Sequence, residues 1–346
     1  MSAPVPLPLA LLASLALSAA ASPPAPEAPD LYAETRPAMS TVVSITVSGA
    51  APAPAARAAA AAFAEFARVE AVMNEWRPES ALSALNAAAG SGASTPLPAD
   101  LCRVLRLARR GAARTGGLFD PTWAALRDLW RFGDGEAGEP PSPAALATRC
   151  PLVSWRDLTV LDQPGGGCRA RLERPGMQVG LGGIAKGWAV DRAAAALRSA
   201  GLRHFLVQAG GDLYASGRRG SRPWRVGLRD PRGGPAEAFA WLDIRDRALS
   251  SSGDYERFFE RDGVRYHHLI DPRTCRPAAA SRAASVLAGS AVEAEILGKA
   301  AFALGGEEAL GLAARSGAEA VLVTSENRVV ASPSLRRRLA WRQPSP

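Results

Sequence analysis

The sequence predicts one mixed α/β (α+β) domain with two lobes, which is not a Rossmann fold. Of its 346 residues, 47% are hydrophobic and 21% are charged, which is typical of a globular protein with a sizeable core. Segments with helical and strand periodicity are mixed without the strict βαβ order of a parallel sheet. With four Cys and no visible internal repeat, disulfide-scaffold, coiled-coil, collagen-like and repeat architectures are excluded.

Individual elements follow from their residue patterns. The β-branched run at 41–48 predicts a strand, and Phe63 and Phe66 lie at helical spacing in the Ala-rich segment 55–73. A second amphipathic helix is expected at 98–114. The remaining expected elements are a Gly/Pro loop at 133–146, a hairpin at 157–172, a short strand at 177–181, a helix at 185–200 ended by Gly201, strands at 204–208, 224–230 and 240–246, a helix at 290–304 and a basic tail at 331–346, of which 336–342 are expected to be solvated.

The first 21 residues have the pattern of a cleavable signal peptide. The apolar run at 7–17 is shorter than the roughly 20 residues that span a bilayer. Residues 19–21 offer a small-x-small cleavage site, although the segment before the run carries no Lys or Arg. We expect export to the periplasm, with an N-terminal membrane anchor as the alternative. The first Cys is Cys102, which excludes a lipoprotein anchor, and residues 22–34 predict a Pro-rich tether.

Export makes disulfide bonds possible. Cys150 and Cys168 flank one strand-like stretch, so a bond between these two is one expectation. Four unpaired buried thiols are the other, because spacing alone does not decide connectivity.

The charge balance favours an anionic ligand. Basic residues outnumber acidic ones by 41 to 33, which gives a net charge of +8. Lys186 and Lys299 are the only lysines, so the other 39 basic residues are Arg (41 − 2). Because no basic stripe is interleaved with aromatic residues, the sequence favours a phosphate-bearing small molecule and no nucleic acid.

A glycine-rich segment, Gly180-Leu181-Gly182-Gly183-Ile184-Ala185, matches G-x-G-x-x-A ahead of the expected helix. Glycines let a backbone approach phosphates, and a helix N-terminus favours anions. A Rossmann unit also requires an acid at the end of the next strand, but that strand ends at Gln208 and Asp212 follows only after two glycines. An anion-binding loop is therefore favoured over a dinucleotide fold, with tight helix packing as the alternative.

Three further positions are candidates for ligand binding or catalysis. Asp120 follows a Gly-Gly turn and suits either a ligand hydrogen bond or an Asx-turn. Trp76 at a helix end suits stacking on a flat ring, or a place in the core. His267 and His268 are adjacent, so on a strand at most one faces a site; a His near Asp271 suits a general base, with a structural role as the alternative. Patterns of a zinc site, an α/β-hydrolase and a P-loop are absent from the sequence.

Taken in order, the motifs form a recognisable series. They are Met39-Ser40-Thr41, Trp76-Arg77-Pro78-Glu79-Ser80, Gly116-Gly117-Leu118-Phe119-Asp120-Pro121-Thr122, Trp130-Arg131-Phe132-Gly133, Gly182-Gly183-Ile184-Ala185-Lys186-Gly187, Gln208-Ala209-Gly210-Gly211-Asp212, Ser252-Gly253-Asp254-Tyr255 and His268-Leu269-Ile270-Asp271-Pro272-Arg273-Thr274. The series resembles the ApbE family, the FAD:protein FMN transferases, across about residues 38–325.

The resemblance implies a single two-lobed ApbE-like domain at 35–330 and a phosphoryl transfer. FAD is split at its pyrophosphate, FMN is attached to a Thr hydroxyl of an acceptor protein, and AMP leaves, with Mg²⁺ spanning the diphosphate. Because no Thr in the chain fits the family's acceptor motif, we expect the acceptor to be another protein, a membrane-bound redox subunit.

Carried over by motif position, the FAD contacts are Met39, Trp76, Leu118, Phe119, Asp120 and Lys186, followed by Asp212, Ser252 and Leu269. His268 corresponds to the base that takes the Thr proton, with Asp271 supporting it.

The sequence departs from the family pattern at the positions that hold the metal ion in the family. Its metal positions fall on Gly183, Glu295 and Lys299, where Glu295 replaces the usual Asp and Lys299 the usual Thr; Gly180 also stands where an Asp is common. One hypothesis is that the Lys299 ammonium replaces part of the cation's charge at the diphosphate, and the alternative is a solvated Lys on a helix face. Cys275 replaces the Gly usual in its turn.

Three functions remain open from the sequence. The flavin transferase leads. An FAD pyrophosphatase would use water in place of Thr and yield FMN and AMP. A non-catalytic FAD-binding accessory protein would bind FAD without releasing AMP.

Overall fold

The computed structural model describes residues 31–132, 138–164 and 167–342, so the predicted signal peptide lies outside the described residues. Its centre is an eight-stranded sheet in the order β1-β2-β6-β7-β10-β15-β16-β17, in which every pairing is antiparallel. The strands are β1 (Leu31–Ala38), β2 (Thr41–Ser48), β6 (Phe205–Ala209), β7 (Asp212–Ser216), β10 (Arg247–Gly253), β15 (Ser281–Ala288), β16 (Glu319–Thr324) and β17 (Val329–Ala331). A Rossmann sheet is parallel, so the predicted mixed fold is confirmed.

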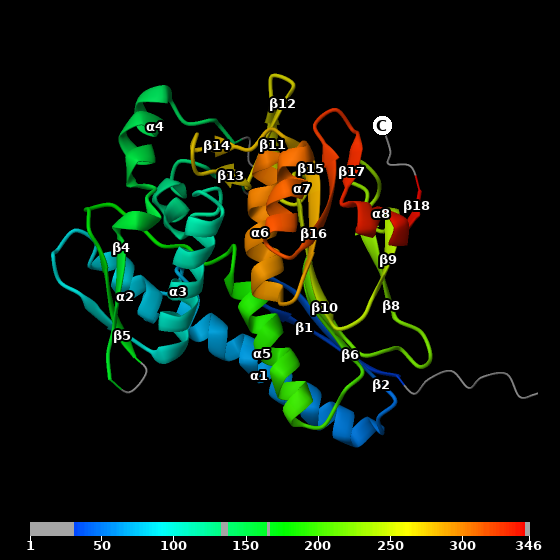
Figure 1. The fold of residues 1–346 in the computed structure, drawn as a ribbon. Helices are drawn as coiled ribbons and strands as arrows, with labels where there is room; N and C mark the ends of the chain where they lie inside the picture. The colour runs from blue at the N-terminus through cyan, green and yellow to red at the C-terminus, as the bar shows by residue number, and fades with distance from the viewer. Residues whose placement is uncertain (1–30, 133–137, 165–166, 343–346) are drawn as a thin grey trace, which may run out of the picture.

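Side-chain alternation gives the sheet two buried faces. In β7, Tyr214 packs on one side, whereas Leu213 and Ala215 pack on the other. Helices α1 (Pro52–Met73), α5 (Ala185–Ser199) and α6 (Ala291–Leu304) cover the first face, with α7 (Gly306–Arg315) beside α6 (Figure 1). The second face is covered by β8 (Trp224–Arg229), β9 (Ala238–Ile244), α8 (Pro333–Arg338) and β18 (Leu339–Trp341).

A second lobe, at the left of Figure 1, is built from short elements. It contains α2 (Ala81–Ala87), α3 (Ala99–Arg114), the 3-10 turns η1 (Pro121–Leu126), η2 (Cys150–Leu152) and η3 (Trp155–Asp157), α4 (Pro143–Arg149), and a sheet of β3 (Thr95–Leu97), β5 (Cys168–Leu172) and β4 (Leu158–Asp162). Two small hairpins lie near the upper end of α6 in the same view, β11 (Phe258–Arg261) with β12 (Val264–His267), and β13 (Ile270–Asp271) with β14 (Arg276–Pro277). Among the described residues, no helix is long and apolar enough to cross a membrane.

Several predicted elements need correction. The segment 177–181 forms no strand, because the Asn86 amide accepts from Val179 N at 2.7 Å and donates to Val179 O at 2.9 Å, in place of a strand neighbour. The loop predicted at 133–146 ends earlier, since α4 begins at Pro143 with Ser142 as its N-cap; residues 133–137 lie outside the described part.

Both ends of the domain are also longer than predicted. The tether at 22–34 overlaps β1, whose pairing with β2 starts at Leu31. The tail at 331–346 is not simply solvated, because Leu335 and Leu339 are buried in the core of the second sheet face. Apolar residues spaced among the Arg residues anchor this segment, and strand β18 pairs with β9.

Two disulfide bonds join Cys102 to Cys168 and Cys150 to Cys275. The predicted Cys150–Cys168 bond is therefore wrong, as is the alternative of four free thiols. The reason lies in the tertiary structure. Cys168 is paired with Leu97 in the small sheet, and the chain runs from Leu97 directly into α3, which carries Cys102. Cys275 has a φ of 56°, the left-handed conformation that favours glycine.

Replacing Cys150 and Cys275 together with alanine is expected to lower the free energy of unfolding by about 2–5 kcal/mol. The bond closes a loop with a sequence separation of 125, so its loss enlarges the unfolded ensemble. Urea denaturation of the variant and the wild type would measure this, with reductant added to both as the control. Equal midpoints for the two oxidised proteins would contradict the prediction.

Candidate active site

A cavity of about 800 Å³ lies between the two lobes and is lined by residues of both. Its size is ordinary for a cofactor or substrate site. The lining includes every residue predicted to contact FAD: Met39, Trp76, Leu118, Phe119, Asp120, Lys186, Asp212, Ser252 and Leu269. Gly183, Lys299 and the predicted base His268 also line it, whereas Glu295 and Asp271 lie behind the cavity wall.

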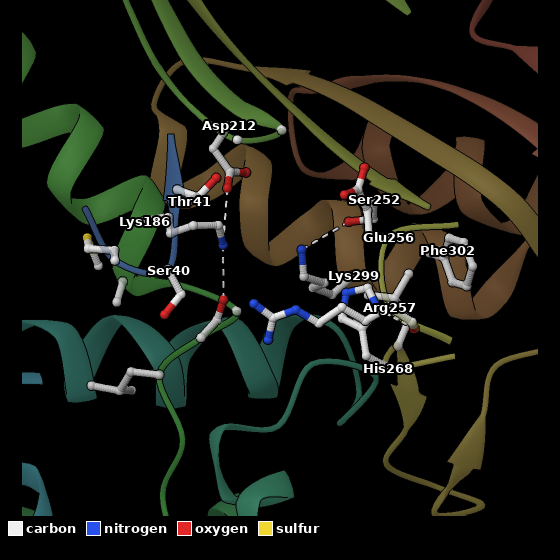
Figure 2. A pocket seen from close by; sticks show the side chains of 18 of the residues that line it. Ser40, Thr41, Lys186, Asp212, Ser252, Glu256, Arg257, His268, Lys299 and Phe302 are labelled. Carbon is white, nitrogen blue, oxygen red and sulfur yellow. Dashed lines mark hydrogen bonds and ion pairs between the residues drawn. The ribbon is translucent and has the colours of Figure 1, made fainter. Parts of the chain in front are cut away.

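Lys186, in the first turn of α5, is held between two buried carboxylates. Its Nζ lies 2.6 Å from Glu295 Oε1 and donates to Gly182 O at 3.1 Å. It also lies 3.2 Å from Asp212 Oδ2 (Figure 2). Burial alone would lower the pKa of the Lys186 ammonium, but the two carboxylates outweigh it and raise that pKa above its usual range. The ammonium therefore stays charged in the pocket wall.

Glu295 is fully buried on α6, and both of its oxygens are used. One accepts from Lys186, and the other accepts from the backbone N–H of Gly187 at 2.8 Å. Gly187 is required here, because a Cβ at that position would lie 2.6 Å from Ala291 O. This close packing of α5 on α6 is reinforced by Asp191, whose carboxylate accepts from the N–H groups of Ala291 and Val292 at 2.8 and 3.0 Å.

Asp212 completes the group that we call the buried charge cluster, namely Lys186, Asp212, Glu295 and Lys299. Asp212 Oδ1 accepts from Ser250 Oγ at 2.5 Å, and Oδ2 faces Lys186. Burial, followed by the Asp212 carboxylate, raises the pKa of Glu295 above its ordinary value. The cluster contains two ammonium groups and two carboxylates, but Lys186 contacts both acids.

Lys299 lies one turn further along α6 than Glu295, and its surroundings differ. Its Nζ donates to Ser252 Oγ at 3.0 Å (Figure 2). No carboxylate lies within ion-pair distance of it in the described part of the chain. Burial and the nearby Lys186 lower the pKa of the Lys299 ammonium, although Glu295 and Asp212 act in the opposite sense.

The Mg²⁺ that the resemblance implies does not fit these residues. Glu295 uses one oxygen on an ammonium and the other on a backbone N–H, and the Lys299 ammonium takes a position expected for a ligand. Ammonium groups repel cations and have no lone pair to donate. No group of three or more His, Cys, Asp or Glu side chains that could hold a metal occurs in residues 31–132, 138–164 and 167–342.

Gly183 precedes α5 and lets the second lobe close over the loop. A Cβ there would lie 3.3 Å from Phe119 Cε2 and 3.9 Å from Lys299 Cε. Gly180 is equally enclosed, because a Cβ would lie 2.9 Å from Ala124 Cβ. No acidic side chain fits at this position without rearrangement.

Asp120 lies at the cavity wall, but both of its carboxylate oxygens accept hydrogen bonds from other groups of the protein. Its Oδ1 accepts from Thr122 N at 2.8 Å and Thr122 Oγ1 at 2.6 Å, and its Oδ2 accepts from Trp155 N at 2.9 Å. The Asx-type turn that the sequence offered as an alternative is therefore present.

Trp76, by contrast, is 70% exposed at the cavity edge, with Arg127 4.8 Å from its ring centre. The indole therefore presents apolar area for a flat ring.

His268 and His267 take opposite roles, as expected for neighbours on an extended chain. His267 is buried, and its Nε2 lies 2.9 Å from Ala278 O. His268 is half-buried in the cavity lining, with Nδ1 3.3 Å from Arg257 O. Burial, then the charge of Lys299 and His267, lowers the pKa of His268 to about 3. His268 is thus a neutral imidazole at neutral pH.

Asp271 does not support His268 as the sequence suggested. Its carboxylate instead accepts from Arg273, at 2.9 Å from the backbone N and 2.8 Å from Nη2. The physical reason is local, because the turn at 271–275 closes on Asp271 and is fixed by the bond from Cys275 to Cys150. The carbonyl of Arg257 takes the orienting role.

Two functional residues were missed from the sequence. Ser250 fixes the Asp212 carboxylate, and Arg257 lines the cavity beside His268 and Lys299 (Figure 2). Ser250 adjoins the Ser252 motif, which is a weak signal. No sequence signal pointed to Arg257, because 39 of the basic residues are Arg and nothing in the pattern separates this one from the others.

Comparison with known proteins identifies the family of this sequence. The sequence pattern of the ApbE family matches residues 39–322. The FAD:protein FMN transferase of Rhodobacter capsulatus is 35% identical over 345 residues, which is 96% of this chain but only 62% of that relative. The FAD:protein FMN transferase of Treponema pallidum is 36% identical over 279 residues, covering 77% of this chain and 76% of the relative.

Solved structures of the same type superimpose on most of the chain. The ApbE protein of Thermotoga maritima gives a TM-score of 0.81 at 28% identity, covering 89% of this chain and 99% of the other. The flavinyl transferase ApbE of Pseudomonas stutzeri gives 0.77 at 28% identity, covering 90% and 97%. With the matched pattern and the shared fold, the chain belongs to the ApbE family.

Proposed function

We propose that this chain is an FAD:protein FMN transferase that attaches FMN through a phosphoester to a Thr of an acceptor protein and releases AMP. The observation that carries the proposal is the neutral His268, held beside two cationic side chains in one cavity. A base for a hydroxyl proton and cations for phosphates are the two requirements of phosphoryl transfer to an alcohol.

The contacts of His268 assign the roles of its two ring nitrogens. With Nδ1 donating to Arg257 O, Nε2 keeps its lone pair and accepts the proton of the acceptor Thr. The Thr oxygen then bonds to the phosphorus of the FMN moiety. The bond from that phosphorus to the bridging oxygen breaks, and its electrons leave with AMP. Lys299 and Arg257, the two cationic side chains beside His268, offset the charge of the phosphates, and Trp76 offers a ring face to a flat part of FAD.

The rate of transfer should show no loss from His268 protonation between pH 8 and pH 5. An ordinary His titrates near pH 6.5, but burial lowers the pKa of His268 to about 3, so the base stays unprotonated throughout this range. The measurement is kcat/KM for the acceptor against pH, which reports the free enzyme. An acidic limb near pH 6.5 would contradict the prediction.

The deciding experiment incubates the purified chain with FAD and a synthetic acceptor peptide carrying the motif Asp/Ser-x-x-Thr-Ser/Gly-Ala-Thr/Ser. AMP release together with a peptide heavier by one FMN residue would support the transferase. AMP release with every such peptide unmodified would favour the pyrophosphatase, and bound FAD without AMP would favour the accessory flavoprotein. Either of the last two results would overturn the proposal.

We also propose that the protein works after export, on an acceptor in a membrane-bound redox complex. The two disulfide bonds support an oxidising compartment, in which such bonds persist. Fractionation of cells followed by detection of the chain with its N-terminus sequenced would test this. A cytosolic chain that keeps residues 1–21 would contradict it.

A further inference from the structure

Both acids of the buried charge cluster already have hydrogen-bond and ion-pair partners within the protein. Lys186 contacts both Asp212 and Glu295, at 3.2 and 2.6 Å. Glu295 in addition accepts from Gly187 N, and Asp212 accepts from Ser250 Oγ. Neither carboxylate makes a hydrogen bond or ion pair with Lys299.

Lys299 is therefore an ammonium in the cavity wall that has no ion-pair partner among the described residues. Only a hydroxyl, that of Ser252, accepts from its ammonium among the described residues. A partly buried ammonium that contacts no carboxylate directly is suited to a ligand that supplies negative charge. The Ser252 hydrogen bond fixes the direction of the ammonium, which lines the cavity.

Arg257 supplies a second free cation next to it. Its backbone carbonyl orients His268, but its exposed guanidinium makes no hydrogen bond or ion pair with any residue that the structure describes. Both Arg257 and Lys299 lower the pKa of His268 through their charge, which places them near the same imidazole. Figure 2 shows Lys299, Arg257 and His268 together on one side of the cavity, with Lys186 on the other.

We propose that Lys299 and Arg257 bind the diphosphate of FAD in place of a divalent metal ion, so that the chain transfers FMN without one. This inference rests on the proposed function. Two monovalent cations supply the same charge as one divalent ion. Their donors suit phosphate oxygens, with Lys299 as a point charge and Arg257 as a planar fork. As the bond to AMP breaks, the negative charge that develops on the AMP phosphate lies beside both groups.

The test compares FMN transfer onto the acceptor peptide in excess EDTA with transfer in excess Mg²⁺, using the purified full chain. The wild type is expected to react at the same rate in both. In EDTA, Lys299→Gln, which can keep a hydrogen bond to Ser252, should lower the rate by about 10–100-fold, as should Arg257→Gln. Lys299→Arg should restore most of the loss. The matched control is Arg261→Gln. Arg261 is exposed, lies close to Arg257 in the sequence, and pairs with Glu139 at 2.8 Å outside the cavity.

The dissociation constant for FAD, measured by flavin fluorescence in EDTA, separates failure of this inference from failure of the function. Wild-type transfer that falls to background in EDTA and returns with Mg²⁺ would overturn the inference and leave the function intact. If no transfer occurs in either condition, the proposed function is wrong. The affinity of the variants for FAD then tests the inference. FAD affinity that is about 10–100-fold weaker in Lys299→Gln would support the site, and unchanged affinity would overturn it.

Discussion

Replacing His268 with glutamine is expected to lower the rate of FMN transfer by about 10²–10⁴-fold and to leave FAD binding nearly unchanged. The imidazole is neutral, its Nδ1 is directed at Arg257 O, and its Nε2 is the free base. A glutamine amide can keep the contact with the carbonyl but cannot accept and hold a proton. The loss should therefore appear in the rate of a single turnover, measured by the mass of the acceptor peptide.

The control for this variant is His204→Gln. His204 is exposed, accepts from Arg218 N through its Nδ1 at 3.1 Å, and does not line the cavity, so its replacement should leave transfer unchanged. Continued AMP release by His268→Gln without peptide modification would agree with a base that serves only the Thr. Transfer by His268→Gln at the wild-type rate would remove His268 from the mechanism.

Much of the fold was predictable because the signals were local. The strand at 41–48 has the bounds of β2, and the helices at 98–114 and 185–200 differ from α3 and α5 by a residue at one end. These segments carry their periodicity within a dozen residues, which a single sequence displays. The short strand at 177–181 failed because a distant side chain, Asn86, took the hydrogen bonds that a strand neighbour would have made.

The sequence predicted which residues line the site, but not which of them contact one another. The motif series brought the predicted FAD contacts to one cavity, because each block lies at a loop or element end facing the gap between the lobes. The pairing of Lys186 with Glu295 spans 109 residues and depends on the close packing of α5 on α6 at Gly187. The partners of Cys102 and Cys150 likewise follow from tertiary packing, which sequence spacing does not encode.

Replacing Lys186 with methionine is expected to lower the free energy of unfolding by about 3–5 kcal/mol. The substitution keeps an apolar chain of similar length but leaves the carboxylates of Glu295 and Asp212 buried without their shared ammonium. Removing one member of a buried ion pair is costlier than removing both, because the remaining charge has no solvent. Urea denaturation at neutral pH would measure the loss.

The matched variant combines Lys186→Met with Glu295→Gln, which removes one of the two stranded charges while keeping its shape. Its stability should lie between that of the wild type and that of Lys186→Met. The pH dependence gives an independent check. Burial already raises the pKa of Glu295, and loss of Lys186 raises that pKa further, so the folded state takes up a proton more readily than the unfolded state.

Stability of Lys186→Met should therefore rise as the pH falls toward the raised pKa of Glu295, and fall as the pH rises through it. The double variant lacks this group and should show a flatter dependence. If Lys186→Met were as stable as the wild type at neutral pH, the ammonium would be dispensable to the fold.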